Sequence, residues 1–374
     1  MKRIYQKFIN EFLNKKIVLI SGPRQSGKTT ISKMDHKQFV YLNFDNENDR
    51  KTILQMSWDK KVKLIIFDEL HKRPAWKQWL KGIYDTNDYG NNFIVIGSAR
   101  LDTYKKVGDS LAGRYFQYRL HPLDVREVCK IEKKSNPDEV IERILNFGGF
   151  PEPYLANNKR FYNLWKKTHL DIILKQDLPD LEDIKNIKNI ELLIDLLKDR
   201  VGSPISYSNL ANDLQVSDKT IKSWLQILEN IYVIFKITPF SKNIARSNLK
   251  QPKYYFYDVA RVSAGEGPQF ENLVACSLFK EVQFRNDCLG EDWNLSYLSK
   301  KGGIEIDFAI TFEGKIQTAI EVKLSDANLA KNFTPFLTEL QNVEKIQLVK
   351  NLEKEKMYPN GVEVRKAASW LCHW

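Results

Sequence analysis

The chain has 374 residues, more than one hydrophobic core usually spans, so two or three domains are expected. No run approaches the roughly 20 apolar residues that a membrane span needs, so we expect no membrane partner. The first residues lack the apolar segment of a signal peptide, and the four cysteines form no closely spaced pair. These features predict a cytoplasmic protein without a zinc or disulfide framework.

The formal net charge of +11 attracts polyanions such as nucleic acid. A lysine-rich surface gives the same charge balance without any nucleic-acid partner. Charge alone therefore leaves open both a DNA-binding protein and a signalling protein with no such partner.

A phosphate-binding loop is predicted close to the N-terminus. The stretch IVLISGPRQSGKTT contains the pattern G-x-x-x-x-G-K-[ST] after an apolar run and before an expected helix. Glycines let backbone N–H groups surround phosphate oxygens, and the start of a helix attracts negative charge. Lys28 is expected to contact the β- and γ-phosphates of ATP, and Thr29 to bind Mg²⁺. The predicted ATP-binding residues of this loop are Gly22, Pro23, Arg24, Gln25, Ser26, Gly27, Lys28, Thr29 and Thr30.

Two further strands are expected to contribute to the same site. The apolar run 64–67 ends in Asp68 and Glu69, which predicts a buried parallel strand with an acidic end. Asp68 is expected to help bind ATP and Mg²⁺, and Glu69 to polarise the attacking water. Ser98 follows the next strand and is expected to sense the γ-phosphate. Arg114 is a candidate arginine finger, acting within the chain or from a neighbouring subunit.

These segments together resemble a prokaryotic family of AAA-type P-loop ATPases. The resemblance rests on SGPRQSGKTT, YLNFDNENDR, IIFDELHKRPAWKQWLKGIYD, IVIGSARL and SLAGRYFQYRLHPLDVREV, and it covers most of the chain. It implies a RecA/AAA-like α/β core in residues 1–132, Mg-ATP as ligand and assembly into a homo-oligomer. Members of the family carry a C-terminal domain known only as domain of unknown function 4143.

Residues 133–240 are expected to form a helical lid that contains a winged helix. The stretch SYSNLANDLQVSDKTIKSWLQILENIYVIFKI has the spacing of two short helices, a tight turn between them and a following strand. Lys219 and Lys222 lie on the exposed side of the second predicted helix and are the candidate DNA contacts. The same module can instead serve only as a packing element.

Residues 241–374 are expected to form an α/β domain. QFENLVACSLFKEV predicts a helix, and WNLSYLSK, GGIEIDFAITF and KIQTAIEVKLS predict three successive strands. ANLAKNFTPFLTELQ is then expected to be a helix and KIQLVK a further strand. The predicted order of elements therefore places a sheet at the end of the chain.

Charged residues interrupt two of these apolar strands. Asp307 lies in the second strand, and Glu321 and Lys323 share one face of the third. A hairpin can bring the two carboxylates together, which would raise their pKa values unless a cation lies between them. An oxygen-only cluster favours Mg²⁺ or Mn²⁺. Beside such a metal, Lys323 is expected to polarise a water for attack on a phosphodiester.

This arrangement resembles the PD-(D/E)XK nuclease superfamily, which includes Holliday-junction resolvases and many restriction enzymes. The resemblance makes Asp307 the motif aspartate, with Ile306 in place of the usual proline, and makes Glu321 and Lys323 the E-x-K pair. It also assigns Glu271 as the acidic residue of the first helix, so that Glu271, Asp307 and Glu321 are the implied metal ligands. Two functions follow: an Mg-dependent ATPase that gates cleavage of DNA, or an ATP-gated nucleic-acid-binding switch or scaffold with an inactive nuclease fold.

Overall fold

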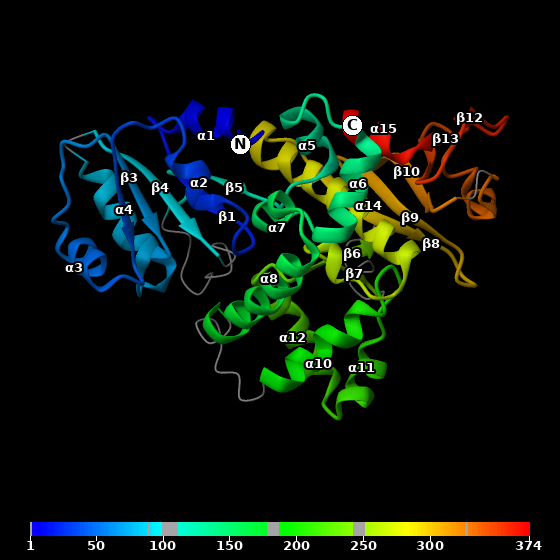
Figure 1. The fold of residues 1–374 in the computed structure, drawn as a ribbon, viewed down its shortest axis with the longest axis horizontal. Helices are drawn as coiled ribbons and strands as arrows, with labels where there is room; N and C mark the ends of the chain where they lie inside the picture. Colours follow the sequence, from blue (N-terminus) through cyan, green and yellow to red (C-terminus); the bar gives the residue numbers. More distant parts are fainter. Residues whose placement is uncertain (1, 88–89, 99–110, 178–186, 242–250, 326–327) are drawn as a thin grey trace. The chain divides into compact units, whose positions relative to one another are not determined.

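The computed structural model describes residues 2–87, 90–98, 111–177, 187–241, 251–325 and 328–374, which form two compact units (Figure 1). Unit 1 consists of Met1–His121, Thr168–Asp183 and Asn230–Tyr232. Unit 2 consists of Pro122–Lys167, Ile184–Glu229 and Val233–Trp374. Both units are therefore assembled from separated stretches of chain. The division into 1–132, 133–240 and 241–374 stays a prediction.

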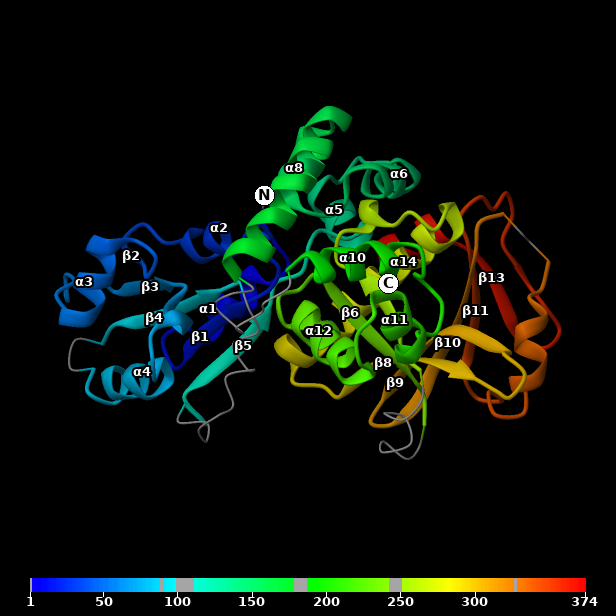
Figure 2. The same ribbon diagram turned by 90° about the horizontal axis from the view of Figure 1, so that it is seen from below.

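Unit 1 contains a five-stranded sheet in which all adjacent strands are parallel (Figure 2). The strand order is β2-β3-β4-β1-β5, and β1 and β3 are buried along their whole length. Such burial is expected for a parallel sheet that is covered on both faces, and it confirms an α/β core. The strands are β1 (Ile17–Ser21), β2 (Phe39–Asn43), β3 (Leu64–Asp68), β4 (Asn92–Gly97) and β5 (Tyr115–Arg119). The elements between them are α1 (Gln6–Phe12), α2 (Lys28–Lys33), α3 (Glu47–Gln55), η1 (Leu70–Lys72) and α4 (Trp76–Asp85).

Unit 2 contains an eight-stranded mixed sheet in the order β12-β13-β11-β10-β9-β8-β6-β7. The hairpin of β9 and β10 is antiparallel, whereas β10 continues into parallel pairing with β11. The strands are β6 (Ile234–Pro239), β7 (Lys253–Phe256), β8 (Trp293–Ser299), β9 (Glu305–Phe312), β10 (Lys315–Lys323), β11 (Glu344–Val349), β12 (Lys356–Met357) and β13 (Val362–Lys366).

The remaining helices lie after β5 in the chain. The long helix α14 (Glu266–Phe284) is the predicted helix before the strands, and it packs against β7, β8 and β10. The other helices are α5 (Val125–Ile131), α6 (Pro137–Phe147), α7 (Pro151–Ala156), α8 (Lys159–Ile172), α10 (Ile187–Lys198), α11 (Tyr207–Leu214), α12 (Asp218–Asn230) and α15 (Ala367–His373). Short helical turns are η2 (Ile173–Asp177), η3 (Val259–Arg261), η4 (Arg285–Leu289) and η5 (Lys331–Phe336).

Two expectations about unit 2 change with the structure. The predicted helix ANLAKNFTPFLTELQ is instead the 3₁₀ turn η5, followed by further turns. Pro335 lies inside this segment, and proline lacks the N–H that an α-helix needs. The helices α11 and α12 are present as predicted, but the strand expected as a wing, β6, belongs to the eight-stranded sheet. The winged helix itself stays a prediction.

No helix in the part of the chain that the structure describes combines the length and apolar character needed to cross a membrane.

Candidate functional site

The predicted phosphate loop connects β1 to α2 in unit 1. Gly22 and Gly27 have φ angles of +146° and +96°, which L side chains rarely adopt. A Cβ atom at Gly22 would lie 2.3 Å from the backbone oxygen of Leu120, so only glycine fits beside that chain segment. The Lys28 ammonium is buried and donates to the backbone oxygens of Gly22 (2.9 Å) and Pro23 (2.7 Å). The loop therefore already curves around a positive charge.

Side chains that the sequence motif does not include hold this loop in place. Buried Arg3 donates to the backbone oxygen of Ser26 at 2.9 Å and to that of His121 at 2.6 Å. The ring Nε2 of His169 lies 3.2 Å from the backbone oxygen of Arg24. Both side chains come from distant sequence positions, so no local pattern could have identified them.

The acidic end of β3 lies beside the start of α2. The Thr29 hydroxyl donates to Asp68 Oδ2 at 3.3 Å, and the Tyr41 hydroxyl donates to the same oxygen at 2.6 Å. The structure thus brings together the two predicted Mg²⁺ ligands. A hydroxyl, a carboxylate and the glycine-shaped loop have the chemistry that Mg-ATP requires, so these residues fit that ligand. Sequence reasoning missed Tyr41, which stands within an otherwise ordinary strand.

Glu69 follows Asp68 in a left-handed conformation, with a φ of +53°. Its Oε2 accepts from the Ser98 hydroxyl at 3.3 Å and lies 3.4 Å from Nε2 of His71. Burial and the neighbouring Asp68 charge raise the pKa of Glu69 above its ordinary value. A carboxylate with a raised pKa is a better proton acceptor, so the geometry suits the predicted action on water.

Arg114 does not reach this site within one chain. Its guanidinium makes two bonds to Asp85, at 2.7 and 3.0 Å. The Arg114 backbone oxygen accepts from Ile17 at the beginning of β1, whereas the phosphate loop follows the end of that strand. The two points are separated by the length of strand β1. Action of Arg114 as an arginine finger, within the chain or from a neighbouring subunit, stays a prediction.

The second predicted site lies on the β9–β10 hairpin of unit 2. Asp307 Oδ2 accepts from the backbone N–H of Val322 at 2.8 Å, so the hairpin brings the two charged strand segments together. Glu321 is 1% exposed, and its Oε1 accepts from Lys323 Nζ at 2.8 Å and from Asn332 Nδ2 at 2.9 Å. Glu321 and Lys323 thus form an ion pair whose carboxylate is buried.

Glu271 joins this cluster from α14. The Tyr255 hydroxyl donates to its Oε1 at 2.7 Å. Burial and the Asp307 charge raise the pKa of Glu271 to about 8, and the same two causes raise the pKa of Glu321 to about 7. The three predicted carboxylates therefore repel one another across a poorly solvated space. Protonation of a carboxylate, or a positive charge placed between the carboxylates, would remove that repulsion.

Lys253 and Glu305 are charged residues of this cluster that the sequence prediction missed. The Lys253 ammonium lies 3.1 Å from Glu305 Oε2, 3.9 Å from Asp307 Oδ1 and 4.0 Å from Glu271 Oε1, and Lys253 is 2% exposed. Burial lowers the pKa of Lys253, but the charges of these carboxylates outweigh it and raise the pKa above its ordinary value. The ammonium is therefore charged at neutral pH. Side chains alternate along β7, so Lys253 and Tyr255 lie on the same face of the strand. This alternation was the sequence signal that could have placed Lys253 beside the Glu271 partner Tyr255.

Whether these residues fit a divalent metal ion depends on their geometry and their charge balance. Within the described ranges, no three His, Cys, Asp or Glu side chains form a ready metal cage. Glu321 Oε2, however, is buried and has no hydrogen-bond partner among the described residues. Four carboxylates face two ammonium groups, which leaves two negative charges if all are ionised. These features fit one divalent cation near Glu321 Oε2, bound after adjustment of side chains. The four carboxylates are those of Glu271, Glu305, Asp307 and Glu321, and the ammonium groups are those of Lys253 and Lys323.

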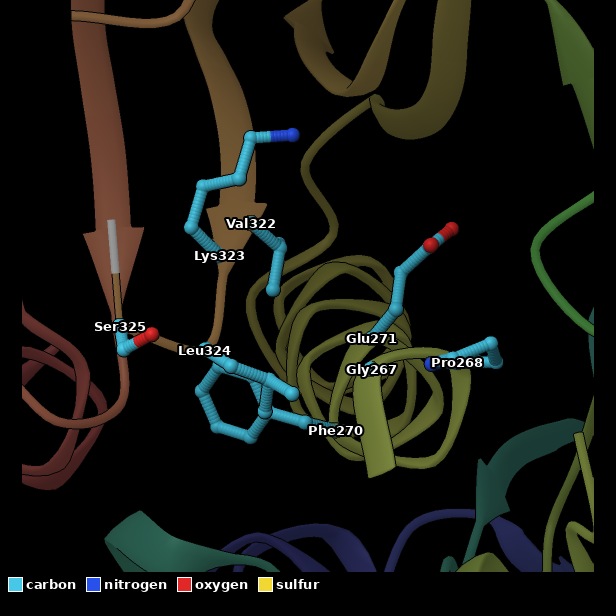
Figure 3. A pocket seen from close by; sticks show the side chains of 8 residues that line it. All are labelled: Gly267, Pro268, Phe270, Glu271, Val322, Lys323, Leu324 and Ser325. Carbon is cyan, nitrogen blue, oxygen red and sulfur yellow. The ribbon is translucent and has the colours of Figure 1, made fainter. Parts of the chain in front are cut away.

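A pocket of about 380 Å³ opens beside the cluster, between the beginning of α14 and the end of β10 (Figure 3). The carboxylate of Glu271 and the ammonium of Lys323 belong to its lining, together with the apolar side chains of Phe270 and Leu324. A ligand in this pocket would therefore reach two of the predicted functional groups. The lining residues are Gly267, Pro268, Phe270, Glu271, Val322, Lys323, Leu324 and Ser325.

The predicted DNA contacts lie on α12. Lys219 and Lys222 are both exposed, and Lys222 Nζ lies 5.1 Å from the centre of the Tyr207 ring. The structure thus places both lysines where the helix pattern predicted them. Contact with DNA stays a prediction.

Two parts of the chain match known protein-family models. Residues 14–129 match the AAA domain, and residues 138–266 match the domain of unknown function DUF8612. The parallel sheet of unit 1 therefore belongs to an AAA-type P-loop ATPase domain. The resemblance implied domain of unknown function 4143, whereas the matched model is DUF8612. The assignment to domain 4143 is therefore not confirmed. Residues 267–374 lie outside both matched ranges.

The chain is also similar to uncharacterized proteins of archaea and bacteria. It is 26% identical over 361 residues to uncharacterized protein MJ1544 of Methanocaldococcus jannaschii, covering 88% of this chain and 80% of the relative. An uncharacterized protein of Haemophilus influenzae is 22% identical over 402 residues, covering 95% and 94%. Uncharacterized protein Rv2008c of Mycobacterium tuberculosis is 28% identical over 246 residues, covering 65% of this chain and 54% of the relative. The chain thus spans about half the length of that mycobacterial protein.

Two solved structures align weakly with the chain. A RuvB variant of Thermotoga maritima has a TM-score of 0.32 at 15% identity and covers 62% of this chain and 87% of its own. The signal transduction ATPase with numerous domains PH0952 of Pyrococcus horikoshii has a TM-score of 0.28 at 15% identity, covering 78% and 52%. Such low scores inform neither the function nor the arrangement of this chain.

Proposed function

We propose that the protein is an Mg-dependent ATPase whose nucleotide state gates a metal-dependent phosphodiesterase site acting on DNA. The observation that carries the second half of this proposal is the cluster of Asp307, Glu321 and Lys323 beside an open pocket. The net charge of +11 supports a polyanionic substrate. Assembly into a homo-oligomer would allow Arg114 of one subunit to act on the nucleotide of another.

At the nucleotide site, the residues of unit 1 would bind and orient. The phosphate loop and Lys28 would hold the phosphates, and Thr29 with Asp68 would hold Mg²⁺. When bound, Mg²⁺ neutralises charge on the phosphates. Glu69 would accept a hydrogen bond from the attacking water, with Ser98 fixing the carboxylate. When Mg-ATP binds, we expect Asp68 to give up the hydrogen bond from the Tyr41 hydroxyl and to contact the metal instead.

At the second site, Asp307, Glu321 and Glu271 would hold one divalent ion near Glu321 Oε2. A bound ion lowers the pKa of a coordinated water and stabilises charge on a phosphate. Lys323 would orient that water, because its ammonium already contacts Glu321 and lines the pocket. The apolar wall that includes Leu324 and Phe270 would keep bulk water away from the reacting phosphate.

The decisive experiment incubates the purified chain with linear, branched and single-stranded DNA, in Mg²⁺ or Mn²⁺, with and without ATP. Cleavage that responds to ATP is expected for the unmodified chain, and it should be lost in Glu321→Gln and in Lys323→Ala. Glu353→Gln, which changes an exposed carboxylate of the same unit, is the matched control. Lys28→Ala should remove ATP binding and the response of cleavage to ATP. Cleavage that persists in Glu321→Gln would show that another site or a contaminant acts, and no cleavage with any DNA would defeat the nuclease proposal.

The second candidate function is an ATP-gated nucleic-acid-binding switch or scaffold with an inactive nuclease fold. It is favoured by Lys253, whose ammonium already neutralises part of the carboxylate cluster. In this case DNA binding should respond to ATP while every DNA remains intact. Fluorescence anisotropy with labelled DNA in the same set of variants separates the two functions.

A further inference from the structure

We propose that Lys253 is a built-in cation of the carboxylate cluster, which takes the place of a second divalent ion and restricts the site to one. The inference rests on the proposed function insofar as that function needs a metal. It adds a residue from β7 that determines how many ions the cluster accepts and how tightly it binds them.

The position of the Lys253 ammonium carries this inference. Three carboxylate oxygens from two elements lie within 4.0 Å of it, those of Glu305, Asp307 and Glu271. Glu305 and Asp307 lie on β9, and Glu271 lies on α14. A group that faces several converging carboxylates occupies the kind of position that a cation takes in an oxygen-rich site.

Burial explains why this ammonium is a lasting part of the cluster. Lys253 is 2% exposed, and lysine is almost never fully buried unless it is paired. Its Nζ also lies 5.1 Å from the centre of the Tyr297 ring, a favourable contact for a cation. Moving the ammonium away would break the ion pairs and leave the carboxylates without their internal counter-charge.

The two sides of the cluster differ in what they can still accept. On the Glu305 side, the Lys253 ammonium lies 3.1 Å from the carboxylate oxygen. On the Glu321 side, one buried carboxylate oxygen has no hydrogen-bond partner among the described residues. Ions in two-metal sites lie about 3.5–4 Å apart. A second ion on the Glu305 side would therefore lie close to the Lys253 ammonium, and the two positive charges would repel each other. One divalent ion on the Glu321 side is the arrangement that remains.

Metal binding measured without nucleotide tests this inference on the full chain. Mn²⁺ is titrated by calorimetry and by its electron paramagnetic resonance signal into the unmodified chain, Lys253→Met and Glu321→Gln. Lys301→Met changes an exposed lysine of the same unit and is the matched control. Asp68→Asn, measured alongside, identifies any ion held at the phosphate loop.

We expect one Mn²⁺ in the unmodified chain that is lost in Glu321→Gln, and a second Mn²⁺ or at least tenfold tighter binding in Lys253→Met. One ion in both, with equal affinity, would overturn the role of Lys253 and leave the proposed function standing. Binding in Lys253→Met alone would support Lys253 as the resident cation and defeat the proposed metal site of the unmodified chain. No binding in either protein would overturn both.

Folding of the variant is monitored by thermal unfolding. Lys253→Met is expected to lower the melting temperature in the absence of divalent ions, and Mn²⁺ should restore it, because the ion replaces the lost positive charge. If Lys253→Met does not fold, the double variant Lys253→Met with Glu305→Gln keeps the net charge of the cluster and takes its place in the titration. A melting temperature that Mn²⁺ does not raise in either variant counts against the inference.

Discussion

The two acidic sites of this protein use different partners for their carboxylates. In unit 1, Asp68 accepts hydrogen bonds from the hydroxyl groups of Thr29 and Tyr41. In unit 2, Asp307 and its neighbours face the ammonium of buried Lys253. Neutral hydroxyl groups leave the negative charge available for an incoming metal, whereas an internal lysine compensates part of it permanently. Similar acidic residues are thus either left available for a ligand, as in unit 1, or partly neutralised from within, as in unit 2.

The largest effect is expected at the nucleotide site. Glu69→Gln should retain ATP binding but lower the hydrolysis rate by on the order of 10²–10⁴-fold, because it removes the group that acts on water. The pKa of Glu69 is raised, and a base acts only when it is deprotonated. Hydrolysis by the unmodified chain should therefore decline as the pH falls. The decline should begin at a higher pH than it would with a glutamate of ordinary pKa.

The measurement is steady-state phosphate release between pH 5 and 9, with binding of a fluorescent nucleotide recorded separately. Glu47→Gln changes an exposed glutamate of unit 1 and is the control. Full hydrolysis in Glu69→Gln would show that this carboxylate does not activate water.

The pH dependence of stability should distinguish unit 2. The pKa of Glu271 is about 8 in the folded chain, above its ordinary value of 4.5, so the folded state binds more protons than the unfolded state between these values. The free energy of unfolding should then fall as the pH rises through this window in the absence of divalent ions. Glu271→Gln should remove that loss and stabilise unit 2 by roughly 1–3 kcal/mol at pH 8.

Urea unfolding at pH 5 and pH 8 tests this expectation, with Mn²⁺ added in a parallel series. The ion should reduce the difference between the unmodified chain and the variant. An identical pH dependence in both proteins would mean that Glu271 is not the carboxyl group that is protonated.

The next effect is expected at Gly202, which lies against the Glu271 carboxylate. Gly202 has a φ of +79°, and a Cβ atom there would lie 2.7 Å from Glu271 Oε2. Gly290 has a similar φ of +70° with nothing within 4 Å, so Gly290→Ala reports the backbone strain alone, about 1 kcal/mol. Gly202→Ala should destabilise unit 2 by about 1–3 kcal/mol more, because the Glu271 carboxylate must move. Equal losses in the two variants would show that the Glu271 side chain adjusts freely.

The smallest effect is expected at the surface of α12. Replacing Lys219 and Lys222 by alanine should lower the salt slope of DNA binding by about 1–2, because each lysine that contacts a phosphate releases one counterion. Lys301→Ala provides the control. The slope is obtained from anisotropy titrations over a series of salt concentrations, and an unchanged slope would remove α12 from the DNA contacts.

Much of the fold could be predicted because its signals are local. The strands β1 and β3 are buried apolar runs, and the strands β9 and β10 follow each other closely enough to pair as a hairpin. Chain order alone implies such pairing. The exception was η5, where apolar spacing suggested an α-helix although Pro335 prevents one.

The sequence by itself determined the groups that local geometry places together. The phosphate loop, with Lys28 and Thr29, is set by glycines at fixed spacing, and Glu321 and Lys323 share a strand face because side chains alternate. Only the tertiary structure decided which distant groups join them. Arg3 reaches His121 across 118 positions, and Lys253 reaches Asp307 from another strand. Such contacts depend on how the sheets are assembled, and that assembly decides which charges remain available for a ligand.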